Sequence, residues 1–296
     1  NLLRITAGLT GVRARPAGPE AASPGGPSSV EPGSTGPVPG EPGSTGAVPG
    51  EPGVGLPGPD ELGPARFPAR EELDPEDAFS RALAAESLAY SALLAGPEFA
   101  AWRAAHPPRP EPPVPDDAVL LARDGDTLRI TLNRPDRRNA LGHGLRDALI
   151  DALEVVAADP ALRAELRGAG PSFCSGGDLD EFGTAADPAT AHVVRLARSA
   201  GLMVHHLRDR VTPHLHGACV GAGIEVPAFA ATVVADPSAW CQLPELSLGL
   251  VPGAGGTVSV THRIGRWRTA WMVLTGARVP AEQALGWGLF DRIVAG

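Results

Sequence analysis

The chain has 296 residues, of which 43% are hydrophobic, and it carries a formal net charge of −9. This length and content suffice for one sizeable domain and a smaller appendage. The excess of acidic residues disfavours nucleic acid and anionic membrane surfaces as partners. No apolar run approaches the roughly 20 residues of a membrane-spanning helix, so we expect no membrane partner.

The cysteines indicate a reducing compartment. Only Cys174, Cys219 and Cys241 are present, and an odd, sparse set is more typical of the cytoplasm than of a disulfide scaffold. None of them has the C-x-x-C or His/Cys spacing of a zinc site. No charged segment followed by an apolar one marks a signal peptide near the N-terminus. We therefore predict a cytoplasmic protein without a metal.

The N-terminal part has low complexity. Residues 1–16 have no clear assignment, and residues 17–64 form a Pro/Gly-rich linker. Within it EPGSTGPVPG, EPGSTGAVPG and the decayed copy EPGVGLPGP follow one another over residues 31–59. This repeat holds almost nothing that could form a core, so it cannot offset its ordering entropy. We predict that the linker is disordered.

Residues 65–116 are predicted to form a helical extension that ends in a Pro-rich linker. Asp74-Pro75 is typical of a helix start, and Gly96-Pro97 breaks the helical pattern. Apolar residues lie near helical spacing at Phe79, Leu83, Leu88, Leu93 and Leu94. The segment 75–105 is therefore predicted to be a helical hairpin that docks on the main domain, with HPPRPEPPVP (106–115) as the linker.

From residue 117 to residue 296, strands alternate with helices. AVLLAR and TLRITL flank Asp124-Gly125 as in a β-hairpin. An apolar helical stripe runs from Leu141 to Val156, and Asp159-Pro160 ends it. Further strands are expected at AELRG, TPHLHGACV and TVVA, with helices near 256–275 and 280–287. This order predicts an α/β domain built of crossover units.

Two glycine-rich junctions follow predicted strands and precede predicted helices. They are GAGPSFCSGGDL (168–179) and HGACVGAGIEV (216–226). Backbone N–H groups left free at a helix start bind anions or developing oxyanions. An ordinary glycine-rich turn is the alternative for each. Neither junction, nor PGAGGT (252–257), has the dinucleotide-binding fingerprint.

Two glutamates stand in apolar surroundings. Glu225 lies in VGAGIEVPAFAA, and Glu245 lies in WCQLPELSLGL. Two carboxylates in one apolar pocket have pKa values that are raised or pushed apart, which suits one as a proton donor and the other as a water-orienting base. Alternatively, each glutamate could hold a helix N-terminus or an arginine.

Taken together, these motifs resemble the enoyl-CoA hydratase/isomerase (crotonase) superfamily over residues 117–294. The supporting stretches are LNRPDRRNAL, GAGPSFCSGGDLDEF, HGACVGAGIEVPAFA, LPELSLGLVPGAGGT, IGRWRTAWMVLTG and AEQALGWGLFDRIV. The resemblance implies a crotonase-like spiral of β-β-α units. It also implies an acyl-CoA thioester as the substrate, no further cofactor, and a homotrimer or hexamer.

The resemblance assigns roles to four residues. Backbone N–H groups of Gly177 and Ala222 would form the oxyanion hole for the thioester carbonyl. Glu225 and Glu245 would hold the water that adds across the double bond. We expect Glu245 to exchange the proton at the α-carbon and Glu225 to activate water for attack at the β-carbon.

For the CoA end, the resemblance points to Arg137, Arg138 and Ser175. Either arginine could meet the CoA phosphates, because the fixed fork of guanidinium donors suits phosphate. A solvated loop arginine is the alternative. Asp178 is expected to cap the helix that follows it.

An enoyl-CoA hydratase, or the reverse dehydratase, is the predicted function. The alternatives are an isomerase, another specialised enzyme of the family, or a non-catalytic acyl-CoA-binding protein. Family members continue into C-terminal helices that cover the active site. We expect the 75–105 helices to take over part of that role.

Overall fold

Helices and strands alternate along the part of the chain that the structure describes, as the sequence pattern predicts. The computed structural model describes residues 75–110, 115 and 117–294, all of which belong to one compact unit. The predicted 1–16 fragment, the 17–64 linker and the start of the 65–116 extension lie outside the described residues.

The helices are α2 (Pro75–Leu94), α3 (Pro97–Ala105), α4 (His143–Ala158), α5 (Pro188–Ala197), α6 (Ala200–His206), α7 (Ala222–Glu225), α8 (Gly256–Ile264), α9 (Arg266–Thr275) and α10 (Ala281–Trp287). Short 3-10 turns are η1 (Pro135–Arg137), η2 (Pro227–Phe229) and η3 (Glu245–Leu248). Within the described ranges, no helix combines the length and the hydropathy that crossing a bilayer requires.

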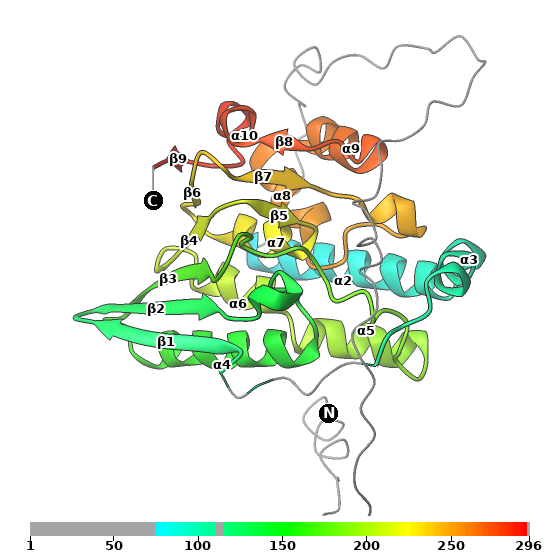
Figure 1. Cartoon of the computed structure of the whole chain (residues 1–296), viewed down its shortest axis with the longest axis horizontal. Helices are drawn as coiled ribbons and strands as arrows, with labels where there is room; N and C mark the ends of the chain where they lie inside the picture. The colour runs from blue at the N-terminus through cyan, green and yellow to red at the C-terminus, as the bar shows by residue number, and fades with distance from the viewer. Residues whose placement is uncertain (1–74, 111–114, 116, 295–296) are drawn as a thin grey trace, which may run out of the picture. The chain divides into compact units, whose positions relative to one another are not determined.

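The strands are β1 (Val119–Asp124), β2 (Thr127–Leu132), β3 (Arg163–Gly168), β4 (Val211–Leu215), β5 (Ala218–Val220), β6 (Val234–Ala235), β7 (Trp240–Gln242), β8 (Val279–Pro280) and β9 (Arg292–Ile293). They form a six-stranded sheet in the order β1-β2-β3-β4-β6-β9 and a three-stranded sheet in the order β5-β7-β8. In Figure 1, β1 (green) lies near the bottom of the view, and β8 and β9 (red) lie near the top.

Parallel pairing dominates the six-stranded sheet, whereas the three-stranded sheet has one parallel and one antiparallel pair. The predicted β1–β2 hairpin is confirmed, with Asp124 opposite Thr127 across a two-residue turn. β2, β3, β4, β6 and β9 then pair in parallel. Parallel neighbours need crossover connections, which α4 supplies between β2 and β3.

Part of the core lies between the six-stranded sheet and α4. Leu145, Leu149, Leu153 and Val156 follow one face of α4 and are at most 2% exposed, and α4 packs against β1 and β2. The predicted apolar stripe is therefore confirmed for this helix. Leu141, however, precedes α4 and forms a β-bridge with Gly177.

Two predicted elements are each divided in the structure. TPHLHGACV is not one strand, because β4 ends at Leu215 and β5 begins at Ala218 in the other sheet. Gly217 makes this turn with a φ of +52°, and a Cβ there would collide with the carbonyl of Pro171. The helix expected near 256–275 is divided at Gly265 into α8 and α9.

The predicted helical hairpin is present and packs on the main domain. α2 contacts α5 and α8, and α3 contacts η3; Figure 1 shows α2 (cyan) crossing the centre of the view. Leu83 is part of the main core. The predicted apolar face was partly wrong, because Leu88 is 57% exposed while Glu86 and Tyr90 are buried.

We expect Leu153→Ala to lower the free energy of unfolding by about 2–5 kcal/mol, because the lost methyl groups leave a cavity under the sheet. Val155→Ala on the same helix is the matched control, since Val155 is 46% exposed and surface changes cost roughly 0.5 kcal/mol or less. Urea unfolding measures both. Equal losses in the two variants would contradict this packing.

Candidate active site

Two chain segments that lie side by side bring the two predicted oxyanion residues together. Cys174 and Cys219 form a parallel β-bridge, in which the Cys174 N–H donates to Ala218 at 3.2 Å and the Val220 N–H donates to Cys174 at 3.1 Å. Three residues further along each segment lie Gly177 and Ala222. The two N–H groups therefore occupy equivalent positions on neighbouring stretches of backbone.

Neither of these N–H groups donates a hydrogen bond to another described residue. Ala222 is the first residue of α7, where an N–H has no partner within the helix. The β-bridge between Leu141 and Gly177 does not use the Gly177 N–H. In this bridge the Leu141 N–H donates to the Gly176 carbonyl, and the Asp178 N–H donates to the Leu141 carbonyl. Two unpaired donors side by side are what a developing oxyanion requires.

Glu225 is buried at the end of α7. Its side chain is 2% exposed, and its Oε2 accepts the N–H groups of Ala254 and Gly256, both at 2.8 Å. Burial raises the pKa of Glu225 well above its usual value, and the charges of Glu245 and Glu86 raise it further, against the effect of the two N–H bonds. The two oxygens therefore differ, because Oε2 is held by two backbone N–H groups and Oε1 accepts neither of them.

Glu245 opens η3 and is 8% exposed. Its Oε2 is buried and has no hydrogen-bond partner among the described residues. Burial raises the pKa of Glu245 to about 7, and Glu86 adds to the effect. Because a buried, unpaired oxygen favours the protonated form, Glu245 is suited to hold a proton near neutral pH.

One oxygen of each acid, Oε1, lies beside Gly221. A Cβ on Gly221 would lie 2.7 Å from Glu245 Oε1 and 3.7 Å from Glu225 Oε1, and its φ is +49°. Glycine is required here both by the backbone conformation and by the approach of the carboxylates. Since Ala222 is the next residue, the structure brings all four predicted residues of the acid pair and the oxyanion hole to one place.

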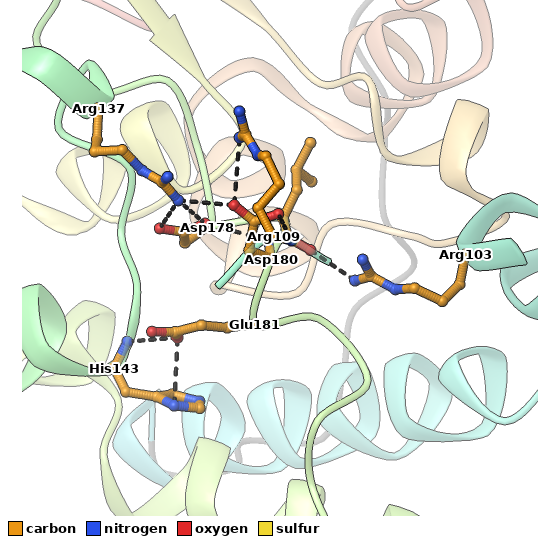
Figure 2. Close-up of polar contacts among 8 residues, drawn as sticks. Arg103, Arg109, Arg137, His143, Asp178, Asp180 and Glu181 are labelled. Carbon is orange, nitrogen blue, oxygen red and sulfur yellow. Dashed lines mark hydrogen bonds and ion pairs between the residues drawn. The ribbon is translucent and has the colours of Figure 1, made fainter. Parts of the chain in front are cut away.

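The residues predicted to bind CoA lie around one turn. The Ser175 N–H donates to the Arg138 carbonyl at 3.0 Å, and the Arg138 side chain is exposed. Arg137 differs, because its guanidinium donates to the carboxylates of Asp178 and Asp180, each at 2.9 Å (Figure 2). A role in CoA binding stays a prediction for all three.

Asp178 does not cap a helix, so that prediction was wrong. The next helix, α5, begins only at Pro188 and is capped by Asp187. Asp178 is instead 3% exposed and pairs with Arg137. The first glycine-rich junction is therefore not a helix start, and only the N–H of Ala222 has a helix, a single short turn, behind it.

The segment after Gly177 is also held by the N-terminal extension. Arg103 of α3 donates to the carbonyls of Leu179 and Phe182 at 2.6 and 2.7 Å. Arg109 donates to the Asp180 carboxylate from its backbone and its side chain. Figure 2 shows these arginines converging on the segment. The extension thereby holds the backbone that follows Gly177.

Three residues near the site were missed from the sequence: Glu86, Tyr90 and Phe182. Glu86 and Tyr90 lie one turn apart on the buried face of α2. Phe182 packs so closely on Gly177 that a Cβ there would lie 2.6 Å from its ring. Glu86 and Tyr90, the chain's only tyrosine, interrupt an apolar stripe. This interruption is the sequence feature that could have pointed to them.

Comparison with known proteins agrees with this geometry. Residues 123–296 match the family described as Enoyl-CoA hydratase/isomerase. The 2,3-dehydroadipyl-CoA hydratase of Escherichia coli is 34% identical over 176 residues, which cover 59% of this chain and 68% of that protein. A mevalonyl-coenzyme A hydratase of Beauveria bassiana is 34% identical over 193 residues, covering 62% and 69%.

Solved structures show the same fold. The enoyl-CoA hydratase of Mycobacterium smegmatis superposes with a TM-score of 0.55 at 32% identity, over 62% of this chain and 71% of that one. The enoyl-CoA hydratase of Thermoplasma volcanium gives 0.56 at 28% identity, over 60% and 72%. The predicted crotonase-like α/β fold is thus confirmed. Among the described residues, no three His, Cys, Asp or Glu side chains are grouped to hold a metal ion.

The buried acids predict a pH dependence of stability. Because the pKa of Glu245 is raised to about 7, the folded state binds this proton more tightly than the unfolded state. The resulting stability is present below the unfolded pKa and is lost as the pH rises through about 7. Glu245→Gln removes the loss, so we expect the variant to exceed wild type at pH 8 by on the order of 3 kcal/mol.

Urea unfolding at pH 4.5, 6 and 8 measures this difference. Glu282→Gln is the control, because Glu282 is exposed on α10. The control should follow wild type at each pH. A Glu245→Gln variant with the same pH dependence as wild type would contradict the burial of an unpaired carboxyl.

Proposed function

Because this chain belongs to the enoyl-CoA hydratase/isomerase (crotonase) family, we propose that it is an enoyl-CoA hydratase. It adds water across the α,β double bond of a 2-enoyl-CoA thioester or catalyses the reverse dehydration. The observation that carries the proposal is the meeting of Glu225 Oε1 and Glu245 Oε1 at Gly221, one residue from the Ala222 N–H. A protein that only binds acyl-CoA needs no such pair of buried acids.

The oxyanion hole stabilises negative charge on the substrate. The thioester oxygen would accept the N–H groups of Gly177 and Ala222, and charge accumulates on this oxygen when the β-carbon is attacked. Fixed backbone donors stabilise such charge without reorganisation, and one donor is typically worth about 3–4 kcal/mol of the barrier.

The two acids divide the proton transfers. Glu225 Oε2 is anchored by two N–H groups, which lower the pKa of Glu225 against the burial that raises it. In the proposed reaction Glu225 is the base, and it accepts a proton from water as the water oxygen bonds to the β-carbon. Glu245, with an unpaired Oε2, donates its proton to the α-carbon. A proton then passes from Glu225 to Glu245, and one water has been added in total.

Of the residues proposed for CoA, Arg138 fits phosphate best because its side chain is exposed. Arg137 is engaged with Asp178 and Asp180 and supports the turn that Ser175 begins. The trimer or hexamer implied by the family stays a prediction. A reducing, cytoplasmic setting is proposed from three buried free thiols.

Crotonyl-CoA tests the reaction, since hydration removes the absorbance of the conjugated enoyl thioester. We expect wild type to consume it, and Glu225→Gln and Glu245→Gln each to lower kcat by about 10²–10⁴-fold, as is typical for lost general acid–base catalysis. Wild type no faster than both variants would contradict the hydratase. Migration of the double bond of a 3-enoyl-CoA without water addition would indicate an isomerase.

Ala222→Pro tests the oxyanion hole. Proline removes the N–H but is tolerated at the first position of a helix. We expect kcat to fall by about 10²–10³-fold, with little change in thermal stability. Ala222→Ser keeps the N–H and serves as the control. Full activity of the proline variant would show that this N–H takes no part.

A further inference from the structure

Four consecutive N–H groups at the start of α8 are divided between two carboxylates. The N–H groups of Ala254 and Gly256 donate to Glu225 Oε2, both at 2.8 Å. Those of Gly255 and Thr257 donate to the two oxygens of Glu86, at 2.7 and 2.9 Å. Each carboxylate thus takes every second N–H of residues 254–257.

Glu86 comes from α2, outside the residues that match the family. It is 6% exposed, and its Oε2 also accepts the Thr257 hydroxyl at 2.6 Å. Burial raises the pKa of Glu86, while the bonds to Thr257 and Gly255 and the charge of Arg195 lower it. Both backbone partners are pure donors, and the positive end of the α8 dipole lies beside them, so this position accommodates a carboxylate. A charge buried at this depth is costly unless it is bonded in this way.

The segment 254–257 has little freedom to shift on its own. Gly255 has a φ of +102°, and a Cβ on Gly256 would lie 2.6 Å from Glu225 Cγ. The ring of Tyr90, one helical turn after Glu86, packs directly on Gly253. The anchor of Glu225 therefore depends on a segment that α2 holds from the other side.

Other titratable or charged groups also face these three acids. They are Tyr90 on α2, whose ring carries the guanidinium of Arg195 from α5 at 4.3 Å, and the buried thiol of Cys174. Arg195 interacts with Glu86 and Tyr90. None of these other groups is a carboxylate. If Glu86 lost its charge, no third carboxylate among them would act on Glu225 and Glu245.

We propose that Glu86 is a positioning residue for the acid pair. It holds residues 254–257 so that Glu225 Oε1 stays turned toward Gly221 and Glu245, and it keeps a third negative charge beside the two acids. This inference rests on the proposed hydratase function. It makes the N-terminal hairpin part of the catalytic unit.

The main test is Glu86→Gln, which keeps the size of the side chain and removes its charge. With crotonyl-CoA, we expect kcat to fall about tenfold or more while KM changes less than about threefold, because substrate contacts are intact. Both limits of the kcat–pH profile should move down by about one pH unit, since a neighbouring negative charge is lost. Wild-type kcat and an unmoved profile would overturn the proposal.

Ser87→Ala is the matched control for docking of the hairpin. Ser87 is the next residue on α2, is buried, and bonds to His192 and Arg195 rather than to residues 254–257. We expect it to leave kcat and the pH limits unchanged. If Ser87→Ala reproduces the effects of Glu86→Gln, the role is general packing and the proposal fails.

Thr257→Val covers the case in which Glu86→Gln does not fold. It removes one hydrogen bond of Glu86 and leaves the carboxyl group in place, so kcat should fall several-fold. An unchanged kcat would contradict positioning.

A titration of the carboxyl carbons separates the proposal from the reaction itself. Carbon-13 NMR of chains labelled at the glutamate carboxyl, assigned with Glu225→Gln and Glu245→Gln, reports both acids directly. Lower pKa values of Glu225 and Glu245 in Glu86→Gln support the proposal even if wild type hydrates no 2-enoyl-CoA. Unchanged values overturn it, whatever the activity.

Discussion

The burial of two carboxylates is the constraint on which the rest of this structure depends. Glu225 and Glu245 are 2% and 8% exposed, and a buried carboxylate is tolerated only when donors or a proton compensate it. Glu225 has two backbone donors, whereas Glu245 Oε2 has none among the described residues. This asymmetry leaves one carboxylate anchored by backbone donors and the other with an unpaired oxygen.

The donors of Glu225 are themselves positioned from far away in the sequence. They belong to residues 254–257, whose alternate N–H groups are bonded by Glu86. The extension therefore does more than cover the domain. Through Glu86 it reaches the anchor of one acid, and through Arg103 it reaches the backbone beside Gly177.

Close approach of backbone segments explains the glycine-rich motifs. A Cβ on Gly221 would enter the space of the two carboxylates, and one on Gly223 would collide with the carbonyl of Cys174. The same neighbouring segments align all three cysteines, since Cys174 bridges Cys219 and Cys219 pairs with Cys241. Small side chains at these positions allow the backbone segments that carry the N–H groups of Gly177 and Ala222 to lie side by side.

Much of this could be predicted from the sequence, because local patterns report local structure. The alternation of strands and helices, the α4 stripe and the α2–α3 hairpin all follow from periodicity and helix-breaking residues. Burial of Glu225 and Glu245 could be inferred from their apolar neighbours. The division of TPHLHGACV between two sheets could not, because it depends on the close approach of the Gly217 backbone to the carbonyl of distant Pro171, which leaves no room for a Cβ.

By itself, then, the sequence determined which residues are chemically unusual: two acids in apolar runs and two glycine-rich turns. Only the tertiary structure decided what they face. Helical periodicity assigned Leu88 to the buried face of α2 and left out Glu86 and Tyr90. In the structure Leu88 is exposed and Glu86 and Tyr90 are buried, because α2 packs against α8 through a carboxylate bonded to backbone N–H groups. Such a contact, across 169 residues, leaves no periodic trace in the chain.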